Sequence, residues 1–340
     1  MSGLLMRVSE AATRIGAHVG RSDGEFTGVT IDSRRVEPGN LFVALSGERV
    51  DGHDFVGAAE AAGAGAALVE REVETSLPLL TVADSQLGLG ALARAWRENF
   101  NIPLVGITGS NGKTTVKEML SAIVSRYMTT LVTQGNLNNE LGVPLTLSRL
   151  DGSHKAAVVE MGASRVGDIR YLAEIAKPTV GVITQCAPAH LEGFGSVDGV
   201  AKGKGEMVES LPISGCAVLN ADDHYIDYWR PRVSSSRTLT FGLSDDAMVT
   251  CDWSQDADGL HLDLTFPEGC ARADLPLLGK HNVMNALAAA AAAFALDLSA
   301  VDIARGLGTM TAVPGRLAMR TRDDGVRVID DSYNANPTSL

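Results

Sequence analysis

Hydrophobic and polar residues follow two rhythms along the chain, and the two predict different kinds of domain. Residues 1–98 alternate short apolar runs, such as "LFVAL" and "AALVE", with the small-residue segment "FVGAAEAAGAG". This alternation predicts a small N-terminal α/β domain. From "IPLVGITG" onward the units lengthen, and each short, continuous apolar run is typical of a parallel strand buried on both faces. We therefore expect a central, mainly parallel α/β domain over residues 99–314.

Short apolar runs and helical patterns mark the elements of this central domain. Its strands are predicted at residues 103–107, 156–161, 179–184 and 216–219. Its helices are predicted at residues 114–127, 197–211 and 282–295. The stretch 237–276 alternates apolar and polar residues, as in "LHLDLTF", and predicts an antiparallel appendage to the sheet.

The end of the chain breaks this pattern at the Pro-Gly pair of "TAVPGRLAM". Only one apolar run follows, in "VRVIDDSYNANPTSL", and a lone strand with its loop cannot form a domain. We therefore expect residues 315–340 to be the start of a truncated C-terminal domain, of which only the first strand is present.

Composition and charge narrow the class of protein. Aromatic residues make up only 5% of a chain that is 45% hydrophobic, which suits helices packed on a parallel sheet. The net charge of -12 leaves no broad cationic surface for a nucleic acid.

The cysteines and the apolar segments exclude further classes of protein. Four scattered cysteines without a CxxC pair argue against a zinc site or a disulfide framework. The first residues lack a signal-like apolar core and the Ala-rich run is too short to span a bilayer, so we expect a cytoplasmic protein without membrane insertion.

A candidate phosphate loop lies in "GITGSNGKTTVKEML", residues 106–120. The predicted strand runs into small residues whose backbone N–H groups are exposed, and the following helix adds the positive end of its dipole. Lys113 can then reach phosphate oxygens, and the hydroxyl of Thr114 can bind Mg2+. Gly109 and Gly112 enclose two residues, whereas the general P-loop pattern has four between its glycines. A glycine-rich turn before an unrelated helix is the plainer alternative.

Polar residues also follow the other predicted strands at their C-terminal ends, where the ligand crevice of an open parallel sheet lies. Glu160 closes "AAVVEMG", His190 lies in "CAPAHLEGFGS", and Asn220 and Asp222 follow "CAVL". A carboxylate and an imidazole near a nucleotide phosphate can bind Mg2+ or support its ligands. Each residue alone fits a strand end or a loop equally well, and their shared edge favours a site.

Two further pairs of residues allow both a structural and a functional interpretation. Lys202 and Lys204 lie on a predicted helix, where most lysines are simply solvated. Asn282 and Asn285 lie one turn apart at a helix start, where capping explains one of them and the pair can bind a base.

Charged residues around the predicted C-terminal domain border, and a loop of the first domain, are equally ambiguous. Arg316 can reach a phosphate, and a carboxylate of the Asp330-Asp331 pair can bind ribose hydroxyls, but surface ion pairs would explain them too. In the first domain, a loop with Ser33 and Arg34 suits a diphosphate or forms only turns.

Six ordered motifs together resemble the Mur ligase family of ATP-dependent peptidoglycan amide-bond ligases: "GITGSNGKTT", "VVEMGAS", "PAHLEGFGS", "GKHNVMNALAAAA", "PGR" and "VIDDSYNANP". The shorter glycine spacing is the form that this family uses. Within it, "DSRRVEPGNLFVALSGERVDGHDF", "QGNLNNELGVPLT" and "DDSYNANPTS" resemble the member that joins D-alanyl-D-alanine to UDP-N-acetylmuramoyl-tripeptide. The resemblance covers essentially the whole chain and implies these two substrates, ATP and two Mg2+ sites; we also expect a monomer.

The resemblance implies a role for each candidate residue. Binding of ATP is implied for the residues of the phosphate loop, which are Gly109, Ser110, Asn111, Gly112, Lys113, Thr114 and Thr115. Further along the chain, Asn282 would contact adenine, Arg316 a phosphate and Asp331 the ribose. A catalytic role is implied for Lys113. It is also implied for three residues at a second Mg2+, which are Glu160, His190 and Lys204. Lys204 matches the lysine that the family carbamylates. Contacts with the UDP diphosphate and the muramoyl-peptide are implied for Ser33, Arg34, Asn136, Asn138 and Asn139.

The implied chemistry activates a carboxylate. The tripeptide carboxylate would attack the γ-phosphate of ATP, and the amine of the dipeptide would displace phosphate from the acyl phosphate. Relatives continue for roughly another domain after "NANP". We therefore expect this chain, which ends at Leu340, to bind nucleotide or UDP-substrate but to be poorly active or inactive alone.

Other functions stay open at this point. A sister ligase that adds the third peptide residue and a folylpolyglutamate synthase share the central domain, although the first-domain motif argues against the folate enzyme. A nucleotide-binding protein without ligase chemistry is a third alternative, against which Glu160, His190 and Lys204 argue. The sequence does not indicate whether the third peptide residue of the substrate is diaminopimelate or lysine.

Overall fold

The computed structural model of the protein describes residues 3–20, 22–311, 318–321, 326–330 and 332. The chain divides into two compact units. The first comprises residues 1–102, 137–154 and 174–177, and the second comprises residues 103–136, 155–173 and 178–340. The predicted α/β class with mainly parallel sheets is confirmed. The predicted domain borders at residues 98 and 314 stay predictions.

The first unit is built on a five-stranded sheet. Its strand order is β2-β7-β6-β5-β4, and every pair is parallel except β2 with β7. The sheet strands are β2 (His18–Val19), β4 (Val29–Thr30), β5 (Leu41–Val43), β6 (Ala66–Val69) and β7 (Leu79–Thr81), and β1 (Leu5–Arg7) pairs with β3 (Glu25–Thr27) in a separate antiparallel ribbon. The helices are α1 (Val8–Ile15), α2 (Val56–Ala61), α3 (Ser85–Arg97), α5 (Gly142–Leu147) and the 3-10 turns η1 (Ser33–Arg35) and η2 (Gly52–Phe55).

Local signals explain how this small unit forms. All residues of β5 and β6 are buried, because apolar clusters cover both faces of the sheet. Helix α3 begins where the side chain of Asp84 accepts a hydrogen bond from the backbone N–H of Leu87 at 2.8 Å, a favourable N-terminal cap. The small α/β unit expected from the sequence is thus present.

The second unit contains a six-stranded sheet in which all strands are parallel. The strand order is β13-β12-β11-β8-β10-β9. The strands are β8 (Leu104–Thr108), β9 (Thr130–Val132), β10 (Ala156–Glu160), β11 (Val180–Ile183), β12 (Cys216–Asn220) and β13 (Arg237–Phe241). The four strands predicted from continuous apolar runs are confirmed, because the core strands are buried on both faces.

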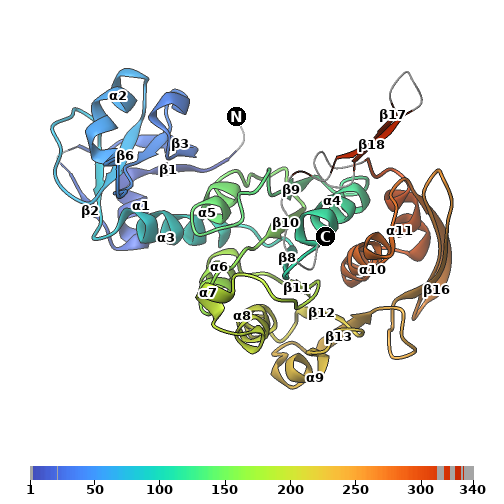
Figure 1. Ribbon diagram of the computed structural model, residues 1–340. Coiled ribbons are helices and arrows are strands. Elements are labelled where there is room, and N and C mark those ends of the chain that lie inside the picture. The colour runs from blue at the N-terminus through green and yellow to red at the C-terminus, as the bar shows by residue number, and fades with distance from the viewer. Residues whose placement is uncertain (1–2, 21, 312–317, 322–325, 331, 333–340) are drawn as a thin grey trace. The chain divides into compact units, whose positions relative to one another are not determined.

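Helices cover both faces of this sheet (Figure 1). Helices α4 (Lys113–Val124) and α10 (Lys280–Ala295) pack on one face, and α8 (Val197–Glu209) packs on the other. Two strand glycines allow α8 to approach closely, because a Cβ on Gly106 or Gly181 would come within 3.0 Å of the Met207 side chain. The remaining helices are α6 (Asp168–Ala176), α7 (Leu191–Phe194), α9 (Ile226–Trp229), η3 (Arg230–Arg232) and α11 (Ala300–Leu307).

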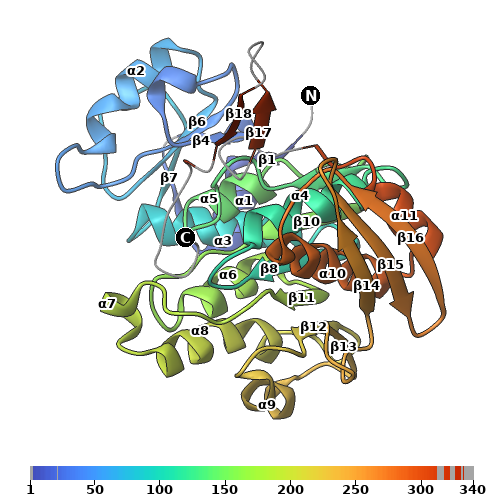
Figure 2. The same cartoon turned by 45° about the vertical axis from the view of Figure 1, so that its right-hand side comes forward.

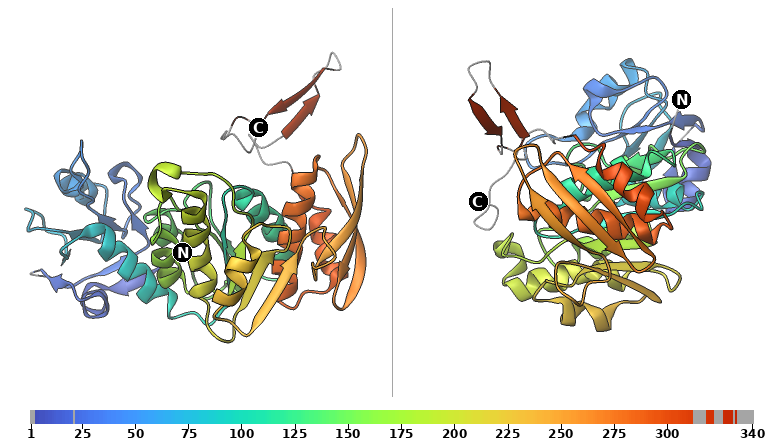
Figure 3. Two further views of the ribbon diagram at one scale, coloured as in Figure 1. Left: turned by 60° about the horizontal axis from the view of Figure 1, so that its bottom comes forward. Right: turned by 90° about the vertical axis from the view of Figure 1, so that its right-hand side faces the viewer.

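A second sheet corrects one prediction. The stretch 237–276 was expected to form one antiparallel appendage, but β13 joins the main sheet in parallel with β12. Its last three residues are buried in succession, as in the other parallel strands. The alternating pattern belongs to a separate antiparallel sheet that packs on α10 and α11 (Figures 2 and 3), formed by β14 (Thr250–Gln255), β15 (Leu260–Phe266) and β16 (Gly269–Leu275).

Helix α10 is enclosed between the two sheets, which explains its sequence. Residues 286–293 are all buried, and alanine lets neighbouring elements approach a helix from every side. Among the described residues, no helix combines the length and apolarity needed to cross a membrane.

The C-terminal part differs from expectation in one respect. Where the sequence predicts one strand, the described residues form a two-stranded antiparallel ribbon of β17 (Ala318–Thr321) and β18 (Arg327–Asp330). Strand β17 was not predicted, because two of its four residues are the polar Arg320 and Thr321, so it has no continuous apolar run.

Candidate functional site

The phosphate loop lies between β8 and α4 at the C-terminal edge of the parallel sheet. Gly109 has φ +147° and Gly112 has φ +82°, conformations that residues with a Cβ rarely adopt. A Cβ on Gly109 would lie 1.9 Å from Oγ1 of Thr184, and one on Gly112 would lie 2.3 Å from Oδ1 of Asn285. The loop with the short glycine spacing therefore packs closely against Thr184 on one side and Asn285 on the other.

Lys113 opens α4 and folds over this loop. Its Nζ donates hydrogen bonds to the backbone oxygens of Gly109 at 2.7 Å and Ser110 at 3.2 Å. The ammonium group thus lies at the loop where the helix N-terminus also contributes positive potential. Thr114 and Thr115 follow on the first turn of the helix, and Thr115 is buried. This arrangement is suited to an anion such as a nucleotide phosphate.

The loop that leaves β11 is hydrogen-bonded to the phosphate loop. Ser110 donates from its backbone N–H to the oxygen of Gln185 at 2.9 Å, and its hydroxyl donates to the oxygen of Ala187 at 2.8 Å. The hydroxyl of Thr184 donates to the oxygen of Asn111 at 2.6 Å. Because the same loop leads to His190, these bonds tie the position of that residue to the phosphate loop.

Glu160 ends β10, directly beside β8 in the sheet, where it is paired in register with Ile107. The residue is 2% exposed, and its backbone N–H donates to Oγ1 of Thr133 at 3.0 Å. A carboxylate at this edge is placed next to the strand that carries the phosphate loop. The prediction that Glu160 shares an edge with that loop is confirmed.

His190 and Lys204 lie on successive elements after β11. His190 precedes α7 with φ +49°, and it is exposed. Lys204 on α8 is 2% exposed, and its Nζ lies 5.4 Å from the centre of the Phe194 ring. Burial, together with the nearby charge of Lys113, lowers the pKa of Lys204 to about 7. Lys202 on the same helix is exposed, in keeping with a solvated lysine.

The two asparagines of α10 interact with each other. Asn282 is buried and donates from Nδ2 to the oxygen of Leu278 at 2.8 Å, and its Oδ1 accepts from Nδ2 of Asn285 at 3.2 Å. Gly279, rather than either asparagine, occupies the N-terminal cap position. Capping therefore does not explain the pair, and Asn285 is the member that approaches the phosphate loop at Gly112.

Residues expected to bind a metal form only a partial ligand set by themselves. Among the described side chains, no group of three or more His, Cys, Asp or Glu residues could hold a metal ion. The residues named for this purpose include a hydroxyl and an amine: Thr114, Glu160, His190 and Lys204. This donor set fits Mg2+ bound mainly through phosphate and water oxygens, because Mg2+ keeps several waters and needs few protein carboxylates.

The candidate residues of the first unit lie in its turns. Ser33 and Arg34 belong to η1, and the Arg34 side chain is 86% exposed and bonded to Asp32 at 2.8 Å. Asn138 is half-buried, whereas Oδ1 of Asn139 accepts from the backbone N–H of Gly142 at 2.9 Å. The exposed Asn136 belongs to the second unit. Arg316 and Asp331 lie outside the described residues.

Thr184 shapes the site but was not singled out from the sequence. Thr184 ends the predicted strand 179–184, so the strand-end rule that indicated Glu160 would also have indicated it. Asn220, which was noted, supports this residue by donating from Nδ2 to the oxygen of Thr184 at 3.1 Å. Asp222 instead binds the turn after β13, by accepting from the backbone N–H groups of Leu243 and Ser244.

Comparison with protein families gives two matches. Residues 107–293 match the Mur ligase middle domain, and residues 25–127 match the Mur ligase family, catalytic domain. The chain is 43% identical over 314 residues to UDP-N-acetylmuramoyl-tripeptide--D-alanyl-D-alanine ligase of Escherichia coli (strain K12). The alignment covers 92% of this chain and 70% of the relative.

Solved structures with the same fold include two MurF proteins. The fold matches crystal structure I of MurF from Acinetobacter baumannii with a TM-score of 0.93 and 36% identity, covering all of this chain and 75% of that chain. It matches MurF ligase from Thermotoga maritima in complex with ADP with a TM-score of 0.82 and 32% identity, covering 92% and 72%.

Proposed function

Because the chain belongs to the Mur ligase family, we propose that it is an ATP-dependent ligase that joins D-alanyl-D-alanine to UDP-N-acetylmuramoyl-tripeptide in peptidoglycan synthesis. The observation that carries this proposal is the common edge of the parallel sheet. There the glycine phosphate loop and Lys113 follow β8, and the buried Glu160 ends the adjacent strand β10. The names of the Escherichia coli and Acinetobacter baumannii proteins support the choice of substrates.

The first chemical step activates the tripeptide carboxylate. One of its oxygens attacks the γ-phosphorus of ATP, the bond from that phosphorus to the bridging oxygen breaks, and ADP leaves with an acyl phosphate formed. Lys113 would leave its two backbone oxygens and bind the β- and γ-phosphates, where its charge offsets the negative charge of the transferring group. The backbone N–H groups of residues 109–115 would hold the phosphate chain in line.

The second step forms the amide bond. The free amine of D-alanyl-D-alanine attacks the acyl carbon, the carbon–oxygen bond to phosphate breaks, and the nitrogen loses a proton to solvent or to the departing phosphate. No nucleophilic side chain takes part, because the substrate carboxylate is itself the group that carries phosphate. The role of the protein is to position two anions and then exclude water from the acyl phosphate.

One Mg2+ would be held by the hydroxyl of Thr114 and a second by Glu160 and His190, together with oxygens of the nucleotide. The two ions would supply positive charge that offsets repulsion between the carboxylate and the γ-phosphate. Glu160 is suited to this role because its side chain is buried at the strand end and its backbone is fixed by Thr133. Asn282 would contact adenine, Arg316 a phosphate, and Asp331 ribose.

Lys204 is proposed to carry a carbamate. Its lowered pKa of about 7 leaves much of the amine neutral, and a neutral amine nitrogen can attack CO2 and release one proton. The product is an anion in place of a cation, which removes the repulsion between Lys204 and Lys113 and adds an oxygen ligand. Burial against the Phe194 ring excludes bulk water from the modified side chain.

The first unit is proposed to bind the UDP-muramoyl part of the substrate. Ser33 and Arg34 lie together on η1. The guanidinium of Arg34 is exposed, so it could leave its ion pair with Asp32 and bind a diphosphate instead. Asn136, Asn138 and Asn139 would face the muramoyl-peptide.

The test is ATP-dependent phosphate release with defined acceptors and amines. It uses this chain extended at its C-terminus by the remaining part of a relative such as the Escherichia coli ligase, because we expect the chain alone to be poorly active. We expect UDP-N-acetylmuramoyl-tripeptide with D-alanyl-D-alanine to stimulate release, and omission of either substrate to abolish the stimulation. Stimulation by the dipeptide precursor with diaminopimelate or lysine, and none by the first pair, would instead assign the ligase that adds the third residue. The Gly109→Ala variant is the control for background phosphatase, because its Cβ cannot fit beside Thr184.

A further inference from the structure

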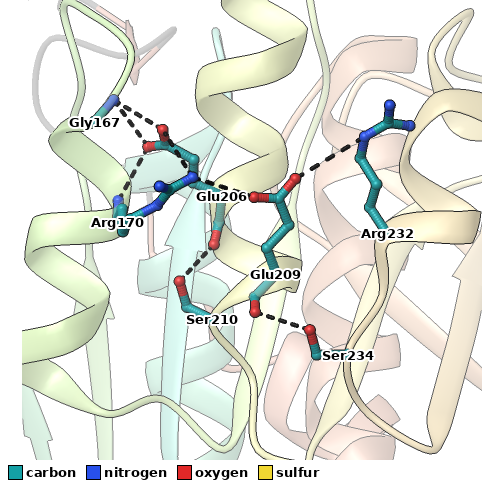
Figure 4. Close-up of polar contacts among 7 residues, drawn as sticks. All are labelled: Gly167, Arg170, Glu206, Glu209, Ser210, Arg232 and Ser234. Atoms are coloured by element: carbon teal, nitrogen blue, oxygen red, sulfur yellow. Dashed lines mark hydrogen bonds and ion pairs between the residues drawn. The ribbon is translucent and has the colours of Figure 1, made fainter.

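Glu206 is a carboxylate buried on α8, two residues after Lys204 and on another side of the helix. Its side chain is 2% exposed. Oε1 accepts a hydrogen bond from the backbone N–H of Gly167 at 2.8 Å, and Oε2 accepts from the backbone N–H groups of Gly167 and Arg170, both at 3.1 Å (Figure 4). Both oxygens of the carboxylate are therefore bound to the backbone of another segment.

That segment is the beginning of α6. The first N–H groups of a helix lack partners within the helix, and a negative charge near them is favourable. Here the charge comes from α8 rather than from a residue just before α6. Oδ2 of Asp168 accepts from the backbone N–H groups of Ser164 and Arg165, which precede the helix, at 2.9 and 3.0 Å. Asp168 therefore orders the connection before α6, and Glu206 binds the N–H groups at the start of the helix.

The bonds of Glu206 join two parts of the proposed site. Glu160 ends β10, and residues 161–167 form the connection from that strand to α6. Glu206 holds the far end of this connection, while Lys204 lies two residues earlier on the same helix. A shift of α8 relative to this connection would therefore change the separation of Glu160 and Lys204.

We infer that Glu206 is a positioning residue, which fixes the helix carrying Lys204 to the connection that follows Glu160 and so sets the spacing of the two groups around the transferring phosphate. This inference rests on the proposed ligase function. Glu206 touches neither nucleotide nor substrate in this account, and acts through the backbone of residues 167–170 and through a long ion pair with the Arg170 side chain at 3.8 Å.

Glu209 provides a matched control one helical turn further on. Its side chain is 34% exposed, and it forms ion pairs with Arg170 at 3.4 Å and with Arg232 at 4.0 Å (Figure 4). It is of the same residue type, on the same helix and near the same arginine, but it accepts no side-chain hydrogen bond from the backbone of the connection. Its replacement therefore removes charge without releasing residues 167–170.

The experiment compares the Glu206→Ala, Glu206→Gln and Glu209→Gln variants of the same C-terminally extended chain by phosphate release at increasing Mg2+. We expect Glu206→Ala to raise the apparent KM for Mg2+ and to lower kcat, each by about tenfold, as for residues that orient metal ligands. Glu206→Gln should recover most of the loss, because its amide oxygen can still accept from Gly167. Glu209→Gln should stay within about twofold of the parent.

Two kinetic outcomes would overturn the inference. In the first, the Glu206→Ala and Glu209→Gln variants have the same Mg2+ dependence. In the second, Glu206→Ala loses thermal stability while kcat and KM per folded molecule stay unchanged.

Hydrogen exchange tests the attachment independently of the proposed function. The amides of Gly167 and Arg170 should exchange faster in Glu206→Ala and not in Glu209→Gln. Absence of phosphate release by the extended parent would reject the ligase assignment, whereas unchanged exchange at these amides would reject the attachment itself.

Discussion

At the scale of single residues, burial distinguishes side chains that the sequence presents alike. Lys202 and Lys204 are two positions apart on one predicted helix, and only the resemblance to a family singled out the second. The structure exposes Lys202 and buries Lys204 near Lys113. Whether a helix residue is buried depends on tertiary packing. The sequence of α8, which buries the charged Lys204 and Glu206 as well as apolar residues, could not separate the two lysines.

Burial should also determine how fast each cysteine thiol reacts. Cys270 is exposed, whereas burial raises the pKa of both Cys186 and Cys251 to about 12, with the Asp223 charge adding to the effect at Cys186. Because the thiolate is the reactive form, we expect iodoacetamide at pH 8 to alkylate Cys270 at least about tenfold faster than Cys186 in the native protein. Peptide mass spectrometry measures the rates, and denatured protein is the control in which all four cysteines react. Equal native rates at Cys186 and Cys270 would contradict this assignment.

At the scale of elements, continuous apolar runs predicted the parallel strands well because both faces of the sheet are covered. The same rule failed at β13, which was grouped with the alternating strands that follow it, and at β17, whose short run carries little signal. Glu206 lay inside a predicted helix but could not be assigned, because its partners at Gly167 and Arg170 are 39 and 36 residues away in sequence.

The contact of α11 with α4 provides a test of packing. A Cβ on Gly306 would lie 2.5 Å from Cα of Ile123, so Gly306→Ala must push the helices apart. We expect it to lower the free energy of unfolding by about 1–3 kcal/mol. Gly308→Ala is the matched control, since its nearest atom would be 3.5 Å away. Urea unfolding measures both, and a Gly306→Ala variant as stable as the control would show that the helices are not packed this closely.

The three-stranded sheet should show a specific pH dependence at His261 on β15. Hydrogen bonds with Asp274 at 2.6 Å and Asp256 at 2.9 Å raise the pKa of His261, and Arg272 faces the same Asp274 at 3.9 Å. A histidine with a raised folded pKa stabilises the fold below its unfolded pKa of about 6.5, and this contribution is lost as pH rises through the folded value.

We therefore expect the parent chain to be more stable than the His261→Gln variant at pH 5.5, and this difference to shrink by pH 9. Thermal unfolding of both proteins at the two pH values measures it. A difference that is the same at both values, or larger at pH 9, would mean that the imidazole charge is not the cause.

At the scale of the whole molecule, the fold class and the order of motifs could be predicted, but the construction of the site could not. The strand-end rule identified Glu160 and His190 as neighbours of the phosphate loop along one sheet edge. It could not reveal that the loop is held by Thr184 and Asn285, because these contacts depend on how far a glycine backbone approaches elements distant in sequence. The domain borders, the metal ligands and the residues that bind substrate stay predictions.

The central claim is that the chain activates a carboxylate by phosphoryl transfer from ATP. The most direct measurement uses UDP-N-acetylmuramoyl-tripeptide labelled with 18O in its terminal carboxylate, together with ATP, Mg2+ and D-alanyl-D-alanine. If an acyl phosphate forms, the oxygen that attacks phosphorus leaves with it, so mass spectrometry should find one 18O in each phosphate released. Amide formation with unlabelled phosphate would show that the carboxylate never bonds to phosphorus, and would contradict the account.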